Sequence, residues 1–153
     1  MKTLRKWFLP AFALLATAAA FAAKPISGPK GGRIFTTEAP HAEFFVEKDR
    51  KVAVTFYDAT LKPVAPGDQV VAAVAEAKTG KVKLEFAKTP TGFVSQQALP
   101  EGDDYTVVVQ LRDTAAAKPK NHRIRFHAEI CGECKRAEYA CACEHAGGEA
   151  HKH

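Results

Sequence analysis

Residues 51–57, Lys-Val-Ala-Val-Thr-Phe-Tyr, are the stretch of the sequence that decides the fold. Apolar side chains occupy every second position, at Val52, Val54 and Phe56. Successive side chains of a β-strand point to opposite faces, so this alternation is typical of a strand and not of a helix. The stretch therefore predicts a strand that turns these three residues toward a hydrophobic core and the alternate residues toward the other face.

Similar short segments, rich in β-branched and aromatic residues, recur on both sides of this strand roughly every ten residues. Turn-forming sequences such as Lys78-Thr-Gly80 separate them. This spacing predicts an all-β fold, an antiparallel sandwich or barrel of seven or eight strands. The alanine-rich residues 68–78 also fit a short helix. The predicted strands are residues 33–36, 43–47, 51–57, 69–75, 82–87, 93–96, 105–111 and 122–130.

The last predicted strand, residues 122–130, alternates in the same way. Ile124, Phe126, Ala128 and Ile130 are apolar, and the residues between them are arginine, histidine or glutamate. The pattern predicts that the four apolar residues face the core along the whole strand.

A turn with a distinctive sequence, Leu99-Pro-Glu-Gly-Asp-Asp-Tyr105, precedes the strand at 105–111. It resembles the tyrosine corner of fibronectin type III and related immunoglobulin-like domains, in which a tyrosine hydroxyl bonds back to the upstream backbone. The resemblance implies an immunoglobulin-like Greek-key sandwich spanning residues 33–130, with Tyr105 buried. The alternative is an ordinary turn followed by an incidental tyrosine.

The N-terminal residues are typical of a secretory signal peptide. A basic start is followed by an uncharged run from Trp7 to Phe21 and by small residues up to Ala22. We expect cleavage after Ala22, a periplasmic or secreted protein without a membrane span, and a flexible lead-in over residues 23–32. An uncleaved anchor is the alternative.

Removal of residues 1–22 would also take away most of the basic excess. The chain has 22 basic and 17 acidic residues, and three of the basic residues but none of the acidic ones lie in this segment. A nucleic-acid partner is therefore not expected, because such proteins carry a basic stripe on the folded domain.

All four cysteines lie near the end of the chain, in the pattern Cys-x2-Cys-x6-Cys-x-Cys. Crowded cysteine and histidine are a metal-binding composition, and thiolates favour zinc, copper(I) or an iron–sulfur centre. We expect residues 131–153 to form a cysteine- and histidine-rich tail that binds a metal ion. The candidate ligands are Cys131, Cys134, Cys141, Cys143, His145, His151 and His153.

The geometry of this tail has two solutions. Residues 135–140 are good or tolerable helix formers, and a helix would hold Cys134 and Cys141 about 10 Å apart along its axis. One ion with bonds of about 2.3 Å to sulfur cannot bridge that distance. A single four-thiolate site therefore requires the chain to fold back between Lys135 and Ala140, a run that contains neither glycine nor proline.

Disulfide formation and a redox function are the two alternatives to metal binding by these cysteines. Exported proteins meet oxidising conditions, so the cysteines could form disulfides in any of three connectivities. Cys131-Gly-Glu-Cys134 also resembles a redox motif, although the all-β surroundings differ from those of thioredoxin. No catalytic constellation is present, because the only serines, Ser27 and Ser95, lack a nucleophile elbow. We do not expect an enzyme.

Four segments resemble small exported bacterial β-sandwich domains found with, or fused to, periplasmic adaptor proteins of heavy-metal efflux systems. These are Gly31–Arg33, Phe44–Val46, Val54–Asp58 and Leu61–Pro66, and the likeness covers residues 30–128. It implies a metal-handling or envelope accessory role, with an envelope protein or efflux component as partner. The mature chain would lack methionine, unlike methionine-rich copper(I) carriers. The alternative functions are a structural or protein-interaction domain with a disulfide-stapled tail, and a thiol–disulfide oxidoreductase.

Overall fold

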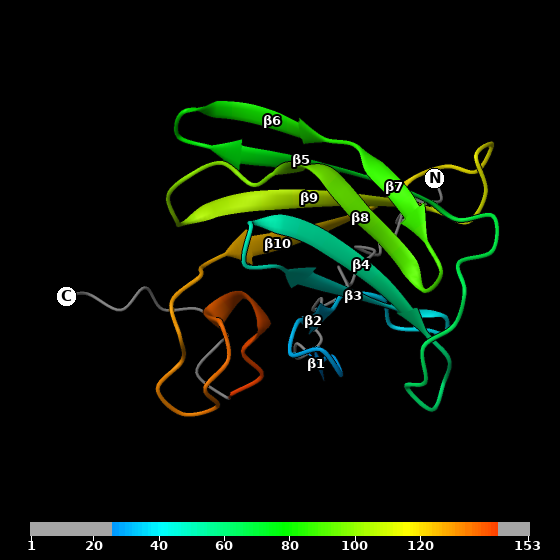
Figure 1. The fold of residues 1–153 in the computed structure, drawn as a ribbon, viewed down its shortest axis with the longest axis horizontal. Coiled ribbons are helices and arrows are strands. Elements are labelled where there is room, and N and C mark those ends of the chain that lie inside the picture. The colour runs from blue at the N-terminus through cyan, green and yellow to red at the C-terminus, as the bar shows by residue number, and fades with distance from the viewer. Residues whose placement is uncertain (1–25, 144–153) are drawn as a thin grey trace, which may run out of the picture.

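The computed structural model describes residues 26–143 of the chain. The predicted signal peptide and the histidines at 145, 151 and 153 lie outside this range. Ten strands form two antiparallel sheets, which lie over one another as the two layers of a sandwich (Figure 1). The predicted all-β sandwich is therefore confirmed.

The larger sheet has six strands. In order across the sheet these are β1 (Ile26–Ser27), β2 (Arg33–Ile34), β3 (His41–Val46), β4 (Lys51–Tyr57), β8 (Gly92–Ala98) and β7 (Phe86–Thr89). The second sheet has four strands, in the order β10 (Lys120–Phe126), β9 (Tyr105–Arg112), β5 (Val70–Ala77) and β6 (Gly80–Leu84). A short 3-10 helix, η1 (Glu138–Ala140), follows them.

The order of neighbouring strands can be compared with that of immunoglobulin-like domains. Those domains place their strands as A-B-E-D in one sheet and G-F-C in the other. The strands β3-β4-β8-β7 and β10-β9-β5 follow the same sequence of neighbours, with β3 taken as the first strand. Membership in that class of domains stays a prediction.

One detail of the strand prediction is corrected, and one alternative is decided in favour of the predicted strand. The predicted strand 82–87 is divided, because the chain changes sheet at Glu85 between β6 and β7. Glu85 is exposed, and its amide is bonded to the side chain of Gln97 on β8 at 2.7 Å. The alanine-rich stretch is a strand, since β5 pairs with β9 on one side and β6 on the other.

The hydrophobic core lies between the sheets. Val52, Val54 and Phe56 are at most 1% exposed, as predicted. The opposite face of β4 is buried as well, since Ala53, Thr55 and Tyr57 are at most 4% exposed. β10 ends at Phe126, so the prediction that Ala128 and Ile130 are core residues is wrong. Ile130 is 65% exposed.

The tyrosine corner is present. The Tyr105 hydroxyl donates to the carbonyl of Pro100 at 3.0 Å and accepts from the guanidinium of Arg50 at 3.2 Å. Arg50 also donates to the carbonyls of Leu99 and Gly102 and lies over the ring of Phe126. The corner therefore ties the β3–β4 turn to the start of β9.

The segment predicted to be a flexible lead-in is paired from residue 26 onward. β1 pairs with β2, and residues 28–32 wrap around the fully buried carboxyl group of Glu43. This group accepts from the amides of Gly32 at 2.7 Å and Lys30 at 3.1 Å, and from the Tyr57 hydroxyl at 2.6 Å. A Cβ atom on Gly28 would lie 2.1 Å from the Glu43 carboxyl carbon, so this position accommodates only glycine.

Candidate metal centre

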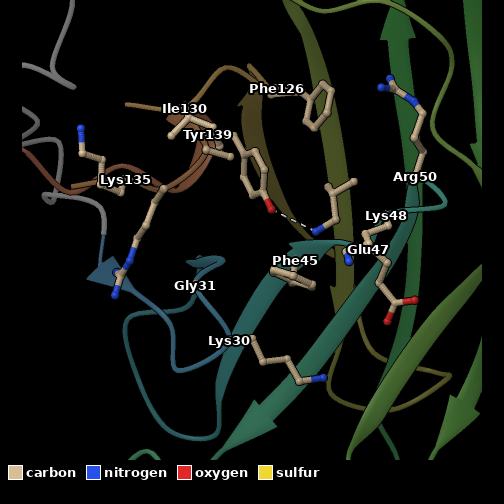
Figure 2. Close-up of a pocket in the computed structure, with 14 residues that line it drawn as sticks. Lys30, Gly31, Phe45, Glu47, Lys48, Arg50, Phe126, Ile130, Lys135 and Tyr139 are labelled. Carbon is tan, nitrogen blue, oxygen red and sulfur yellow. Dashed lines mark hydrogen bonds between the residues drawn. The ribbon is translucent and has the colours of Figure 1, made fainter. Parts of the chain in front are cut away.

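The cysteine segment, residues 131–143, is attached to the sandwich by Tyr139. This side chain is 5% exposed, stacks on Phe126 and meets the edge of Phe44. Its hydroxyl accepts a hydrogen bond from the amide of Val46 at 3.0 Å, as the dashed line in Figure 2 shows. Tyr139 and Ala140 thus belong to the hydrophobic core. The cysteine segment is anchored in the fold at its centre.

The chain folds back on itself immediately before this anchor. Ile130 and Ala137 form an antiparallel bridge, and the Cys131 amide donates to the carbonyl of Arg136 at 2.8 Å. The turn between them is closed by the Lys135 amide, which donates to the Cys131 carbonyl at 3.1 Å. Lys135 adopts a positive φ of 58°, which reverses the chain direction. This hairpin returns the chain past Cys131.

The helix considered for residues 135–140 is therefore absent. The chain does fold back, but the reversal lies between Cys131 and Arg136, earlier than the predicted residues 135–140. Only η1 is helical, and it contains a single short turn. A left-handed residue such as Lys135 cannot continue a right-handed helix. The burial of Tyr139 also requires the chain to run back to the sandwich. Propensity favoured a helix, and tertiary packing overrode it.

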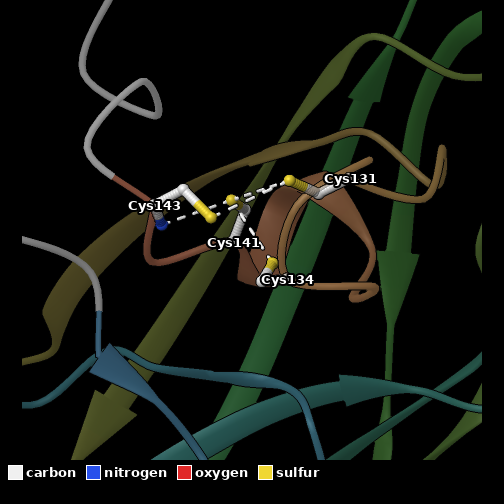
Figure 3. A group of neighbouring side chains, drawn as sticks. All are labelled: Cys131, Cys134, Cys141 and Cys143. Carbon is white, nitrogen blue, oxygen red and sulfur yellow. Dashed lines mark hydrogen bonds between the residues drawn. The ribbon is translucent and has the colours of Figure 1, made fainter.

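The fold-back brings all four cysteine sulfurs together (Figure 3). Their Sγ atoms all lie within 4.8 Å of one another. Cys141 is central, with its sulfur 3.4 Å from that of Cys131 and 3.6 Å from that of Cys134, while the sulfurs of Cys131 and Cys143 are 3.9 Å apart. Four sulfurs at these distances are close enough to hold one metal ion together.

These distances match a tetrahedral metal site better than a disulfide. With zinc–sulfur bonds of about 2.3 Å, adjacent sulfurs of a tetrahedron lie about 3.8 Å apart. Bonded disulfide sulfurs are about 2.05 Å apart. None of the four cysteines forms a disulfide in the structure. The three sulfur–sulfur separations of 3.4, 3.6 and 3.9 Å lie near this tetrahedral spacing, so the four cysteines could hold one ion.

The local electrostatics differ among the thiols. Hydrogen bonds from the backbone at Cys134 and Glu133 lower the pKa of Cys131 to about 7. Burial raises the pKa of the Cys141 thiol, and the neighbouring sulfur of Cys141 raises the pKa of Cys143. Cys131 is therefore the thiol of these three that ionises first, and the others require a nearby positive charge to ionise near neutral pH.

Of the predicted ligands, the structure brings together the cysteines at 131, 134, 141 and 143. The predicted histidine ligands lie outside the described residues. Sequence reasoning did not identify Tyr139 as the anchor, although a lone aromatic residue among charged and small residues in a tail was a usable signal. It also missed the buried Glu43, whose signal was an acidic residue between Ala42 and Phe44 in a predicted strand.

Comparisons with known proteins give no match: no protein-family profile, curated protein or solved structure is similar to this chain. Over residues 26–143, no helix combines the length and apolar character needed to cross a membrane.

Proposed function

We propose that this chain is an exported metal-binding accessory module, in which a β-sandwich carries one soft metal ion in a centre formed by Cys131, Cys134, Cys141 and Cys143. The observation that supports it is the convergence of four sulfurs, contributed by both arms of a fold-back, within 4.8 Å. A disordered thiol-rich tail would not need a buried tyrosine to position it.

Zinc is the metal that this ligand set favours. Four thiolates in a tetrahedral arrangement are typical of zinc or an iron–sulfur centre. Copper(I) is the other metal that thiolates select, and the described residues contain no methionine to assist it. A complete set of four protein ligands leaves no open position, so we infer a binding or structural role for the metal and not a catalytic one.

Cobalt substitution and zinc titration of protein purified under reducing, anaerobic conditions test this function. We expect one equivalent of metal, and for Co²⁺ the intense visible bands of a tetrahedral thiolate site. Each of the four cysteine-to-serine variants should lose the bands. Ala142→Ser is the matched control, because it adds a hydroxyl at an exposed position between two of the ligands. Loss of binding in the control, or full binding in a serine variant, would contradict the four-thiolate centre.

The competing function is a protein-interaction sandwich whose cysteines are stapled as disulfides. The sulfur of Cys141 lies 3.4 Å from that of Cys131 and 3.6 Å from that of Cys134, so the distances do not select one of the three possible connectivities. Thiol counting and metal analysis of the same sample, isolated without reductant, separate the two functions. Four thiols with one metal support the metal centre, and no thiols with no metal support the disulfides.

Export is proposed from the N-terminal sequence and from the resemblance to periplasmic sandwich domains of metal-efflux systems. An envelope protein or efflux component is the partner that this role implies. Intact-mass measurement of protein from the envelope fraction should give a chain that begins at Ala23 or Lys24. A retained N-terminal segment would contradict cleavage and leave the metal centre unaffected.

A further inference from the structure

A groove of about 450 Å³ lies beside the candidate metal centre. One wall is the β3–β4 turn, which contributes Glu47 and Lys48, and the opposite wall is the cysteine segment, which contributes Lys135 and Arg136. Figure 2 shows Lys135 and Ile130 on one side of the groove, and Glu47, Lys48 and Arg50 on the other. Lys30, from the loop around Glu43, lies at the lower end of this view.

The charge of the groove is strongly positive. Five of its lining residues are lysine or arginine, and Glu47 is the one carboxylate among them. Arg50 is used by the tyrosine corner. Lys30, Lys48 and Arg136 form no ion pair with any residue in the range 26–143, whereas the lysines at 51, 81, 83 and 120 each do. These three cations are therefore available to an acidic partner.

The floor of the groove is apolar. Its accessible apolar surface comes from the half-buried Phe45 and Ala137 and from Ile130 at the rim, while Phe126 and Tyr139 lie beneath it, 1% and 5% exposed. A phosphate or a nucleic-acid backbone would contact the cations but would leave this apolar surface uncovered. In a peptide with carboxylates on both sides of one apolar side chain, the carboxylates can pair with the cations at the rim and the apolar side chain can pack on the floor.

The groove is also coupled to the cysteines through the chain. Lys135, Arg136, Ala137 and Tyr139 all lie between Cys134 and Cys141, whose sulfurs are 3.6 Å apart. A metal ion bound by those sulfurs would close this segment into a loop with the groove residues on its outside. Loss of the ion would remove that closure and loosen one wall.

We propose that this groove binds an acidic peptide segment of a partner protein, with one apolar side chain of the peptide on the floor, and that the metal ion holds the groove in its binding shape. The coupling to metal rests on the proposed function; the acidic-peptide specificity rests on the groove alone. The partner would then bind the metal-loaded module more tightly than the metal-free module. By thermodynamic linkage, the bound peptide must also strengthen the binding of the metal ion.

Fluorescence anisotropy with a labelled nine-residue peptide, a central leucine flanked by glutamates, tests the proposal on the full chain. The zinc-loaded protein should bind this peptide at least about tenfold more tightly than its glutamine version or a version with serine for leucine. Lys48→Glu and Arg136→Glu should each weaken binding about tenfold, while Lys118→Glu, an exposed lysine outside the groove, should not. Chelation of the metal should weaken binding by a similar factor.

Several outcomes would overturn the proposal. Equal binding of the glutamate and glutamine peptides would contradict the acidic-peptide site. So would unchanged peptide binding in both charge-reversal variants, Lys48→Glu and Arg136→Glu. Displacement of the peptide by a short single-stranded DNA or polyphosphate, at equal charge concentration, assigns the groove to polyanions. Equal binding with and without zinc overturns the coupling. Zinc stoichiometry, measured on the same samples, shows separately whether the metal centre itself exists.

Discussion

Two short irregular segments of this protein are each organised around acceptor side chains. Residues 28–32 wrap around the Glu43 carboxyl group, and residues 131–143 wrap around four sulfurs. The two segments touch, since the Ser27 hydroxyl next to the first segment donates to the carbonyl of Ala140 in the second at 3.2 Å. They differ in what surrounds the acceptors.

The carboxyl group of Glu43 faces donors supplied by the chain, namely two backbone amides and the Tyr57 hydroxyl. The four sulfurs chiefly face one another. Protonated thiols are weak donors and weak acceptors, and thiolates at these distances repel each other. The first segment is therefore complete as a protein structure, whereas, under the proposed function, a cation at the centre of the second would add to the stability that Tyr139 already provides.

Removal of the metal should lower the local stability of residues 131–143 much more than that of residues 28–32, and this is the largest effect that we expect. At free zinc a thousand times its dissociation constant, zinc should stabilise the fold by about 4 kcal/mol. Chelation should accelerate hydrogen exchange at the amides of Cys131 and Lys135, but not at the amide of Gly32. Urea unfolding and exchange mass spectrometry measure both effects. Equal acceleration in the two segments would show that they unfold as one unit.

A change in pH should have opposite effects at the two centres. Ligation removes protons from thiols, so zinc affinity should fall as the pH decreases from 8 to 6, on the order of tenfold per pH unit for each thiol that is still protonated. The pKa of Cys131 is about 7, and the pKa values of Cys141 and Cys143 lie above that of an ordinary thiol. Zinc binding at pH 6 should therefore release about three protons from these thiols. Competition with a chromophoric chelator between pH 6 and pH 8 gives the slope. A slope near zero would contradict thiolate ligation.

At the other centre, burial and the hydrogen bond to Glu43 raise the pKa of Tyr57. A raised pKa means that the stabilisation is complete below the unfolded-state value of about 10 and declines as the pH rises above it. Because the pKa values of Tyr105 and Tyr139 are also raised, urea unfolding from pH 8 to pH 11 should show a decline in both proteins that is steeper in the wild type than in Tyr57→Phe. A parallel decline in both proteins would assign it to other groups.

Glu43→Ala should destabilise the fold with or without zinc. It leaves the buried amide of Gly32, the part-buried amide of Lys30 and the buried hydroxyl of Tyr57 without this acceptor, and we expect a loss of about 3 kcal/mol or more. Urea unfolding of apo and zinc-loaded protein measures this loss. The exposed Glu129→Ala is the control and should cost less than about 0.5 kcal/mol. A loss confined to the zinc-loaded form would mean that Glu43 acts on the metal centre and would remove the distinction between the two segments.

The smallest effects should come from two tyrosine hydroxyls. Tyr139→Phe leaves the Val46 amide unpaired, and Tyr105→Phe leaves the Pro100 carbonyl without this donor. Each change should cost about 1 kcal/mol by urea unfolding. Because Tyr139 lies between the ligands, only its replacement should also weaken zinc binding. An effect of Tyr105→Phe on zinc affinity would show that the sandwich corner and the metal centre are coupled.

The sandwich was largely predictable because its signals are local. Alternation along residues 51–57 and the turn before Tyr105 each depend on neighbouring residues and on the two-residue period of a strand. The two-residue alternation gave a wrong prediction where it continued beyond the end of a strand. Ala128 and Ile130 continue the alternation of β10, yet no sheet continues beyond Phe126 to bury them.

The metal centre was predictable in composition and not in geometry. The spacing of the cysteines selected the four residues, but it left a helix and a fold-back as equal solutions. The choice depends on Tyr139, which packs between Phe44 and Phe126 from strands that are distant in the sequence. Local helix propensities of a few tenths of a kcal/mol per residue are small beside the burial of an aromatic side chain, worth about 2 kcal/mol.

The sequence by itself determined the strands, the tyrosine corner and the identity of the four clustered thiols, because these follow from the period of a strand and from the spacing of residues along the chain. The tertiary structure alone decided that the four sulfurs meet, that Glu43 is buried under a glycine-rich loop, and that a cationic groove runs beside the cysteines. Each of these depends on contacts between residues that are not neighbours along the chain, such as Tyr139 with Phe44. Their positions follow from the packing of the sandwich and not from any local preference of the chain.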